Sequence, residues 1–253
     1  MTTGKVIPGA ESFFYPGNSI GILICHGFNG TPQSVRYVGE SLADKGFTVY
    51  APRLQGHGTD EFEMEATHYQ EWIQNIEVAY RKLKQTCTHI FAMGQSMGGT
   101  LVLDLATKLP CEGILTINAA LEVPEYKIYR DHSAPRFITE GAPDIKDNNT
   151  SEITYDRVPI KTINQLLKIM DHTSQQLENI SCPALLFHSP EDHVVPAQCT
   201  TNQIYNSIMS HSKKLISLGN SYHVASLDYD KDLIIEHAYH FIKENSKGAT
   251  IAS

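Results

Sequence analysis

The sequence THIFAMGQSMGGTLVLDLATKL, residues 88–109, holds the stretch that decides the fold. Residues 88–93 form a short apolar run that ends at Gly94, which is typical of a buried strand. From Met97 onward the apolar residues recur at helical spacing, and Pro110 marks the end of the predicted helix. Between the two, GQSMG matches G-x-S-x-G, a sharp turn that exposes a serine hydroxyl at the carboxyl end of a sheet. This context favours Ser96 as a nucleophile over the alternative, a glycine-rich connection whose serine only caps the helix.

Strands and helices are predicted to alternate along most of the remaining chain. Residues 19–25 (SIGILIC) are a continuous apolar run, typical of a strand covered on both faces. Amphipathic helices are predicted at residues 69–83 and 230–244. Further strands are predicted at residues 47–51, 113–118, 184–188 and 214–218. The alternation predicts an α/β fold with a mostly parallel, doubly wound sheet, in which ligands bind beyond the carboxyl ends of the strands.

Residues 121–176 interrupt this alternation. Prolines punctuate the segment, residues 144–151 are polar and turn-like, and one clear helix follows Pro159. Unstructured loops of that length are rare in compact domains. We therefore interpret the segment as a small cap inserted into a core formed by residues 1–120 and 177–253.

The composition argues against several classes of protein. The chain has 253 residues and a formal net charge of −8 with no basic run, which argues against a nucleic-acid partner. Its apolar runs are too short to span a bilayer, and no apolar run follows the single lysine of residues 1–10. We therefore expect no integral membrane segment and no signal peptide. Five widely spread cysteines without a C-x-x-C pair indicate reduced thiols and a cytoplasmic location.

The sequence lacks the usual motifs for metals and nucleotide cofactors. It contains no H-E-x-x-H, paired Cys/His spacing, G-x-G-x-x-G or P-loop pattern. We therefore expect neither a metal nor a cofactor.

A serine nucleophile needs a base, and the base needs an acid that holds its tautomer. In this kind of sheet the expected chain order is serine, then an acid after a later strand, then a histidine near the end. Asp192 lies four residues beyond the predicted strand 184–188, and His223 lies in the loop after the last predicted strand. We therefore predict that Ser96, Asp192 and His223 form a catalytic triad. Glu191 is the neighbouring alternative for the acid, and its position closer to the strand makes Asp192 the preferred candidate.

The oxyanion that forms on an attacked ester needs backbone N–H donors. One should come from the residue after the nucleophile, Met97, and another from the loop after the strand 19–25, at Phe28. Because only their backbones would be used, both side chains are free to be apolar and to line an acyl pocket. Helix residues after Pro159 would cover the acyl chain.

At these residues the chain resembles bacterial monoacylglycerol lipases of the Bacillus type, within the α/β-hydrolase superfamily, and less closely the small carboxylesterases. The similar segments include HGFNGTP (26–32), GQSMGGTL (94–101), EDHVVP (191–196) and NSYHVASLDYD (220–230). The sequence departs from these relatives at Gln95, where they often carry Leu, and at Asn29, where they carry Thr.

The resemblance implies the α/β-hydrolase fold, the same triad and oxyanion hole, and a role for Glu152 in binding glycerol hydroxyls. It implies cleavage of monoacylglycerols to fatty acid and glycerol through an acyl-enzyme, with a cap that touches lipid surfaces transiently. The expected substrate-binding side chains are Glu152, Phe28, Met97, Ile138, Leu166, Leu167, Met170 and Val194. Two alternatives stay open: a general short-to-medium-chain carboxylesterase, and a non-catalytic binding relative.

Overall fold

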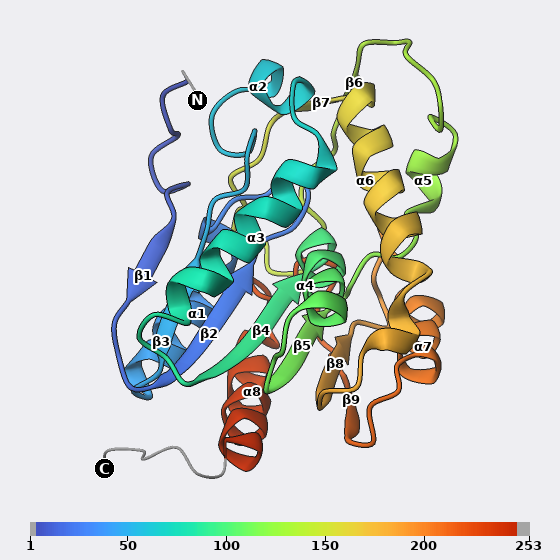
Figure 1. Ribbon diagram of the computed structural model, residues 1–253. Coiled ribbons are helices and arrows are strands. Elements are labelled where there is room, and N and C mark those ends of the chain that lie inside the picture. The colour runs from blue at the N-terminus through green and yellow to red at the C-terminus, as the bar shows by residue number, and fades with distance from the viewer. Residues whose placement is uncertain (1–3, 247–253) are drawn as a thin grey trace.

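A seven-stranded sheet forms the centre of the computed structural model, which describes residues 4–246 (Figure 1). Residues 1–3 and 247–253, at the two ends of the expected core, lie outside the described range. The strand order is β1-β3-β2-β4-β5-β8-β9, with β1 antiparallel to β3 and the other neighbours parallel. These strands are β1 (Phe13–Tyr15), β2 (Ile20–Cys25), β3 (Thr48–Ala51), β4 (His89–Gln95), β5 (Gly113–Ile117), β8 (Ala184–His188) and β9 (Lys213–Ser217). The predicted parallel, doubly wound sheet is confirmed.

Helices cover both faces of the sheet because its strands are apolar on both faces. In β2, Ile22 and Ile24 pack into one core, and Leu23 and Cys25 into the other. The first core lies against α1 (Gln33–Asp44) and α8 (Lys231–Asn245). The second core lies against α3 (Tyr69–Leu83), α4 (Met97–Lys108), α6 (Ile160–Ser174) and α7 (Ala197–Ser207).

Residues 121–176, called the cap segment below, leave the sheet after β5 and return to it before β8. Their elements are α5 (Pro124–Lys127), β6 (Phe137–Thr139), β7 (Arg157–Pro159) and α6, followed by the 3-10 turn η1 (Leu177–Asn179). β6 and β7 pair antiparallel, and they lie with α5 and the start of α6 at the upper right of Figure 1. α6 packs on the helix α4 that follows Ser96.

Six short elements of the structure were not predicted from the sequence. They are β1, α2 (Glu61–Glu65), α5, β6, β7 and η1. Each has three to five residues, which is too short for a periodic pattern to appear. The longer predicted elements are confirmed with ends that differ by at most two residues, except that α6 continues to Ser174, beyond the predicted end at Met170.

No helix within residues 4–246 combines the length and the apolar character that a membrane-spanning helix needs.

Candidate active site

Ser96 sits in a strained turn between β4 and α4. Its φ of 56° and ψ of −121° fall in a region that non-glycine residues rarely adopt. The glycines on either side make this turn possible, because a Cβ at Gly94 would overlap the Gly98 carbonyl, and a Cβ at Gly98 would overlap the carbonyl of Cys25. The Ser96 N–H donates to the Ile117 carbonyl of the neighbouring strand at 2.9 Å, which holds the turn against the sheet.

His223 connects Ser96 with Asp192 through both nitrogens of its ring. Nε2 lies 2.8 Å from the Ser96 Oγ, and Nδ1 lies 2.8 Å from the Asp192 Oδ2. Because a carboxylate only accepts, Nδ1 carries the proton and donates it to Asp192, which leaves Nε2 to accept from the serine hydroxyl. The Asp192 side chain is fully buried, and its Oδ1 accepts the N–H groups of Val194 and Val195 at 2.8 Å each.

The surroundings of His223 favour its protonated form. Burial alone lowers the pKa of the imidazole, but the Asp192 carboxylate raises it, and Asp144 and Glu152 add to that effect. The net result is a pKa above the ordinary value of a histidine. The ring can therefore hold the proton that a serine gives up during attack on an ester.

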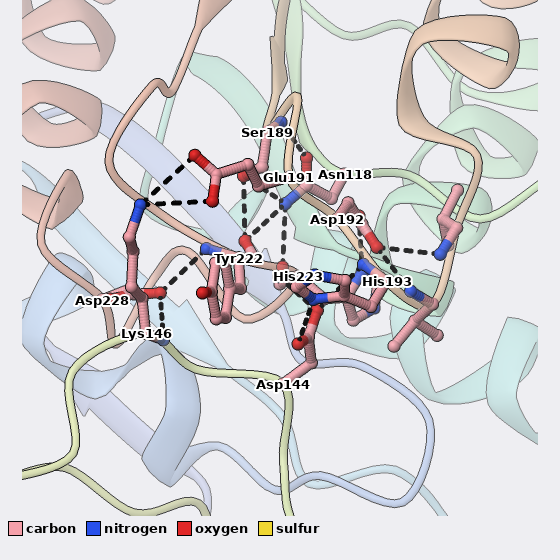
Figure 2. Close-up of polar contacts among 12 residues, drawn as sticks. Asn118, Asp144, Lys146, Ser189, Glu191, Asp192, His193, Tyr222, His223 and Asp228 are labelled. Atoms are coloured by element: carbon pink, nitrogen blue, oxygen red, sulfur yellow. Dashed lines mark hydrogen bonds and ion pairs between the residues drawn. The ribbon is translucent and has the colours of Figure 1, made fainter.

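The two neighbouring acids of the loop after β8 point in different directions (Figure 2). Glu191 reaches outward and pairs with Lys146 at 3.3 Å. Asp192 points inward to His223, so the geometry selects Asp192, the preferred candidate, over Glu191.

The loop after β2 lies directly against Ser96. A Cβ at Gly27 would come within 3.3 Å of the Ser96 Cβ, so the backbone of this loop runs beside the nucleophile. Among the hydrogen bonds of residues 4–246, none uses the N–H of Phe28 or Met97. Both N–H groups are thus left without an acceptor in the described residues, and their use as oxyanion donors stays a prediction.

A cavity of about 560 Å³ opens beside Ser96 and His223. That volume lies within the usual range for small-molecule sites. Of the expected substrate-binding residues, those in its wall are Phe28, Ile138, Glu152, Leu166 and Val194.

Three of the expected pocket side chains do not line the cavity. Met97, Leu167 and Met170 are at most 2 % exposed and belong to the core between α4 and α6. Leu167 lies next to Leu166 on α6, and one residue rotates the side chain by about 100° around a helix. Of these four core residues only Leu166 lines the cavity, so the lining role expected for Met97, Leu167 and Met170 is corrected.

Glu152 brings a carboxyl group into the wall of the cavity. It lies so close to Gly30 that a Cβ on that glycine would overlap its Oε1. Burial raises the pKa of Glu152 to about 7, although a hydrogen bond with Ser34 and the charge of His223 lower it. The side chain can therefore switch between hydrogen-bond donor and acceptor near neutral pH.

A second polar group in the cavity wall pairs Glu140, whose segment departs from the more apolar relatives, with Tyr126, which the sequence did not indicate. The Tyr126 hydroxyl donates to Glu140 Oε1 at 2.6 Å, and both residues line the cavity. Burial raises the pKa of Glu140, and the Tyr126 ring packs edge-on against Phe28 with centroids 5.9 Å apart. Tyr126 lies in the four-residue helix α5 and Glu140 directly follows the three-residue strand β6, and elements this short show no repeating pattern that indicates which way a side chain points.

The sequence also matches known protein families over most of its length. The model of the family described as "Serine aminopeptidase, S33" matches residues 19–230. The chain belongs to this α/β-hydrolase family.

Individual relatives of this α/β-hydrolase include lipases and esterases. A thermostable monoacylglycerol lipase from Bacillus sp. (strain H-257) is 42 % identical over 245 residues, covering 95 % of this chain and 97 % of that protein. A carboxylesterase from Bacillus subtilis (strain 168) is 27 % identical over 240 residues, covering 92 % of this chain and 96 % of that protein. A solved structure from work on LipS and LipT, two metagenome-derived lipolytic enzymes, has a TM-score of 0.92 and 41 % identity, covering 95 % of this chain and 100 % of that chain.

In this α/β-hydrolase, side-chain amides form hydrogen bonds between the sheet and the loop after β9, which carries His223. Gln95 at the end of β4 donates to the His223 carbonyl at 2.7 Å, and Asn118 donates to the same oxygen at 2.8 Å. Asn118 also accepts the Ser189 N–H at 2.7 Å, which connects the loops after β5 and β8. Gln95 thus contacts the loop that carries His223 through a hydrogen bond.

Residues 4–246 contain no group of three or more His, Cys, Asp or Glu side chains placed to hold a metal ion.

Proposed function

We propose that this protein is a serine ester hydrolase that cleaves monoacylglycerols to a fatty acid and glycerol. The observation that carries the proposal is the chain of two 2.8 Å contacts, from Ser96 to His223 and from His223 to Asp192, at the edge of a cavity. The 42 % identical relative named as a monoacylglycerol lipase supports the substrate class.

The reaction follows from the positions of the three side chains. Ser96 Oγ attacks the ester carbonyl carbon while its proton passes to His223 Nε2, and Asp192 stabilises the imidazolium. The proton then passes to the leaving glycerol oxygen, and an acyl-enzyme remains on Ser96. A water molecule attacks that ester, gives a proton to His223, and releases the fatty acid as Oγ regains its proton.

Two backbone donors would stabilise the negative charge of each tetrahedral intermediate. The N–H groups of Phe28 and Met97 are the proposed oxyanion hole, and in such holes one donor contributes about 2.7–4 kcal/mol to transition-state stabilisation. This assignment is supported by the position of the Phe28 loop beside Ser96.

Residues 121–176 are proposed to act as a cap that selects the substrate. Ile138 and Leu166 provide apolar surface for the acyl chain, while Glu152 offers a carboxyl group to the glycerol hydroxyls. A cavity of about 560 Å³ gives limited room beyond one acyl chain and glycerol, so di- and triacylglycerols should be poor substrates.

The first test is the variant Ser96→Ala. The wild-type protein should be labelled by a fluorophosphonate probe and should hydrolyse monoacylglycerol. Ser96→Ala should lose the label and about 10⁴-fold or more in kcat, since the nucleophile is gone. A wild-type protein that neither reacts with the probe nor hydrolyses esters would instead favour the non-catalytic binding relative.

A general carboxylesterase is the second candidate, and the 27 % identical carboxylesterase favours it. The chemistry of the two candidates is the same, so only substrate selection separates them. A series of kcat/KM values over acyl length and alcohol group measures that selection. Equal values for glycerol esters and simple alkyl esters would support the carboxylesterase, and comparable turnover of mono- and triacylglycerols would contradict the proposed substrate.

We also propose a cytoplasmic location. The five cysteines, which are all free thiols, support it because disulfides are rare in the cytosol.

We further propose that the cap segment touches lipid surfaces transiently. Ile128, an apolar residue that lines the cavity and is 67 % exposed, supports this contact.

A further inference from the structure

Asp144, a residue of the cap segment, contacts both loops that carry His223 and Asp192 (Figure 2). Its Oδ2 accepts the backbone N–H of His223 at 3.0 Å and the backbone N–H of His193 at 3.1 Å. Its Oδ1 lies 2.8 Å from the Nδ1 of His193. One carboxylate therefore joins the loop after β8 to the loop after β9.

The backbone around Asp144 is fastened to the same place. The Asp144 carbonyl accepts the N–H of Val224 at 3.0 Å. Two residues further on, the Lys146 N–H donates to the buried Asp228 at 2.8 Å, and Asp228 also accepts the N–H of Tyr222 at 2.9 Å. The cap segment thus bonds directly to His223 and Val224, and it shares the carboxylate of Asp228 with Tyr222.

Asp144 also acts on the imidazole through its charge. Three carboxylates raise the pKa of His223, namely Asp192 after β8 and Asp144 and Glu152 of the cap segment. Asp144 and His223 line the same cavity, so the charge of the carboxylate lies close to the imidazole ring. Its partner His193 is 61 % exposed, so the pair Asp144–His193 borders solvent on its other side.

We propose that Asp144 is a positioning residue for the general base His223, supplied by the cap segment rather than by the core. Its carboxylate holds the backbone so that Nε2 stays within reach of the Ser96 hydroxyl, and its charge stabilises the imidazolium that forms when the serine proton is transferred. This inference rests on the proposed function, because it assigns Asp144 a part in the same proton transfer.

The variants Asp144→Asn and Asp144→Ala separate the two effects. Asparagine keeps an oxygen for both backbone N–H groups and can donate its amide to His193, so it removes the charge and little else. The acidic limb of kcat/KM should then move to lower pH, and the ratio of activity near pH 5.5 to that near pH 8 should rise about threefold. Alanine removes the acceptors as well as the charge, so the acidic limb should shift in the same way and, in addition, kcat near pH 8 should fall about tenfold with little change in KM for a simple alkyl ester.

Glu191→Gln is the matched control. It also turns one carboxylate of this region into an amide, but Glu191 pairs with Lys146 at the surface and does not contact His223. Its pH profile should equal that of the wild type. Thermal unfolding of each variant shows whether the fold is kept, and Asp144→Asn keeps the test valid even where Asp144→Ala fails to fold.

Three results would overturn the inference. One is an Asp144→Asn pH profile that matches those of the wild type and Glu191→Gln. Another is an increase in KM restricted to glycerol esters, since Asp144 would then bind substrate instead of orienting the base. The third is full activity of Asp144→Ala. If Ser96→Ala abolishes hydrolysis while Asp144→Asn changes nothing, the proposed function stands and only this inference fails.

Discussion

Glu152 shows at the scale of one residue how the cavity combines a polar group with apolar walls. The carboxyl group approaches Gly30 closely enough to require a glycine there. Leu166 and Ile138 provide apolar parts of the same cavity. Such a group can recognise the hydroxyls of glycerol, which simple alkyl esters lack.

Replacing Glu152 should therefore change substrate selection more than the chemistry. In Glu152→Ala, kcat/KM for a monoacylglycerol should fall about 10- to 100-fold, because hydrogen bonds to a charged group contribute about 1.5–3 kcal/mol. The kcat/KM for an ethyl ester of the same acyl chain should change little, since it has no hydroxyl to lose. Glu152→Gln keeps a hydrogen-bond acceptor, so its kcat/KM for the monoacylglycerol should lie between the values of the wild type and Glu152→Ala. An equal loss on both esters would assign Glu152 to the fold rather than to the glycerol group.

Two structural elements of the core hold the segment in which Glu152 lies. Asn29, in the loop after β2, donates to the Tyr155 carbonyl at 3.0 Å and accepts the Tyr155 N–H at 3.1 Å. At the start of α1, Gln33 donates to the Ser151 carbonyl at 2.9 Å and accepts the Ile153 N–H at 3.1 Å. The two amides pair with the backbone on both sides of Glu152, much as a neighbouring strand would.

Removing the Asn29 amide should loosen this arrangement. Asn29 has a φ of 59°, so glycine is the suitable replacement because it adopts that conformation without strain. Asn29→Gly leaves the buried backbone groups of Tyr155 unpaired, and we expect a loss of about 1–3 kcal/mol in the free energy of unfolding. KM for monoacylglycerol should also rise, because Glu152 is less well held.

Gln33→Ala is the comparison for Asn29→Gly. Its bonds lie nearer to solvent, so water can replace them and the loss should be smaller. Denaturant unfolding and steady-state kinetics measure both variants. If Asn29→Gly is as stable as the wild type and keeps its KM, the amide pairing has no part in holding Glu152.

For the molecule as a whole, burial of the Glu152 carboxyl group lowers the free energy of unfolding at neutral and alkaline pH. Its pKa is about 7 in the folded protein, above the ordinary value of 4.5, so the folded state retains a proton that the unfolded state has lost between those values. The free energy of unfolding therefore decreases as pH rises through this range. With about 1.4 kcal/mol for each pKa unit, the decrease amounts to at most about 3.5 kcal/mol above the folded pKa.

Glu152→Gln should relieve this effect because it removes the ionisation and keeps the shape. We expect a higher Tm than the wild type near pH 8.5 and a similar Tm near pH 4.5, where the carboxyl is protonated in the folded state. Thermal unfolding of both proteins over this pH range measures the difference. A Tm difference that does not depend on pH would contradict the raised pKa of Glu152.

Much of this architecture follows from the sequence because its causes are local. Apolar runs and helical spacing predicted the parallel sheet, and G-x-S-x-G predicted the turn at Ser96 because only glycines fit beside it. The chain order of serine, acid and histidine then indicated Asp192 and His223, since the carboxyl ends of parallel strands meet at one edge of a sheet.

Tertiary structure alone decided the rest, because it depends on where irregular segments cross. Contact with His223 selected Asp192 over Glu191, and packing of α6 on α4 turned Leu167 away from the cavity that Leu166 reaches. Asp144 lies 79 positions from His223 along the chain, in a segment without periodicity. Its contact with the loop that carries His223 arises only when the cap segment folds over the end of the sheet, so no local pattern in the sequence predicts this contact.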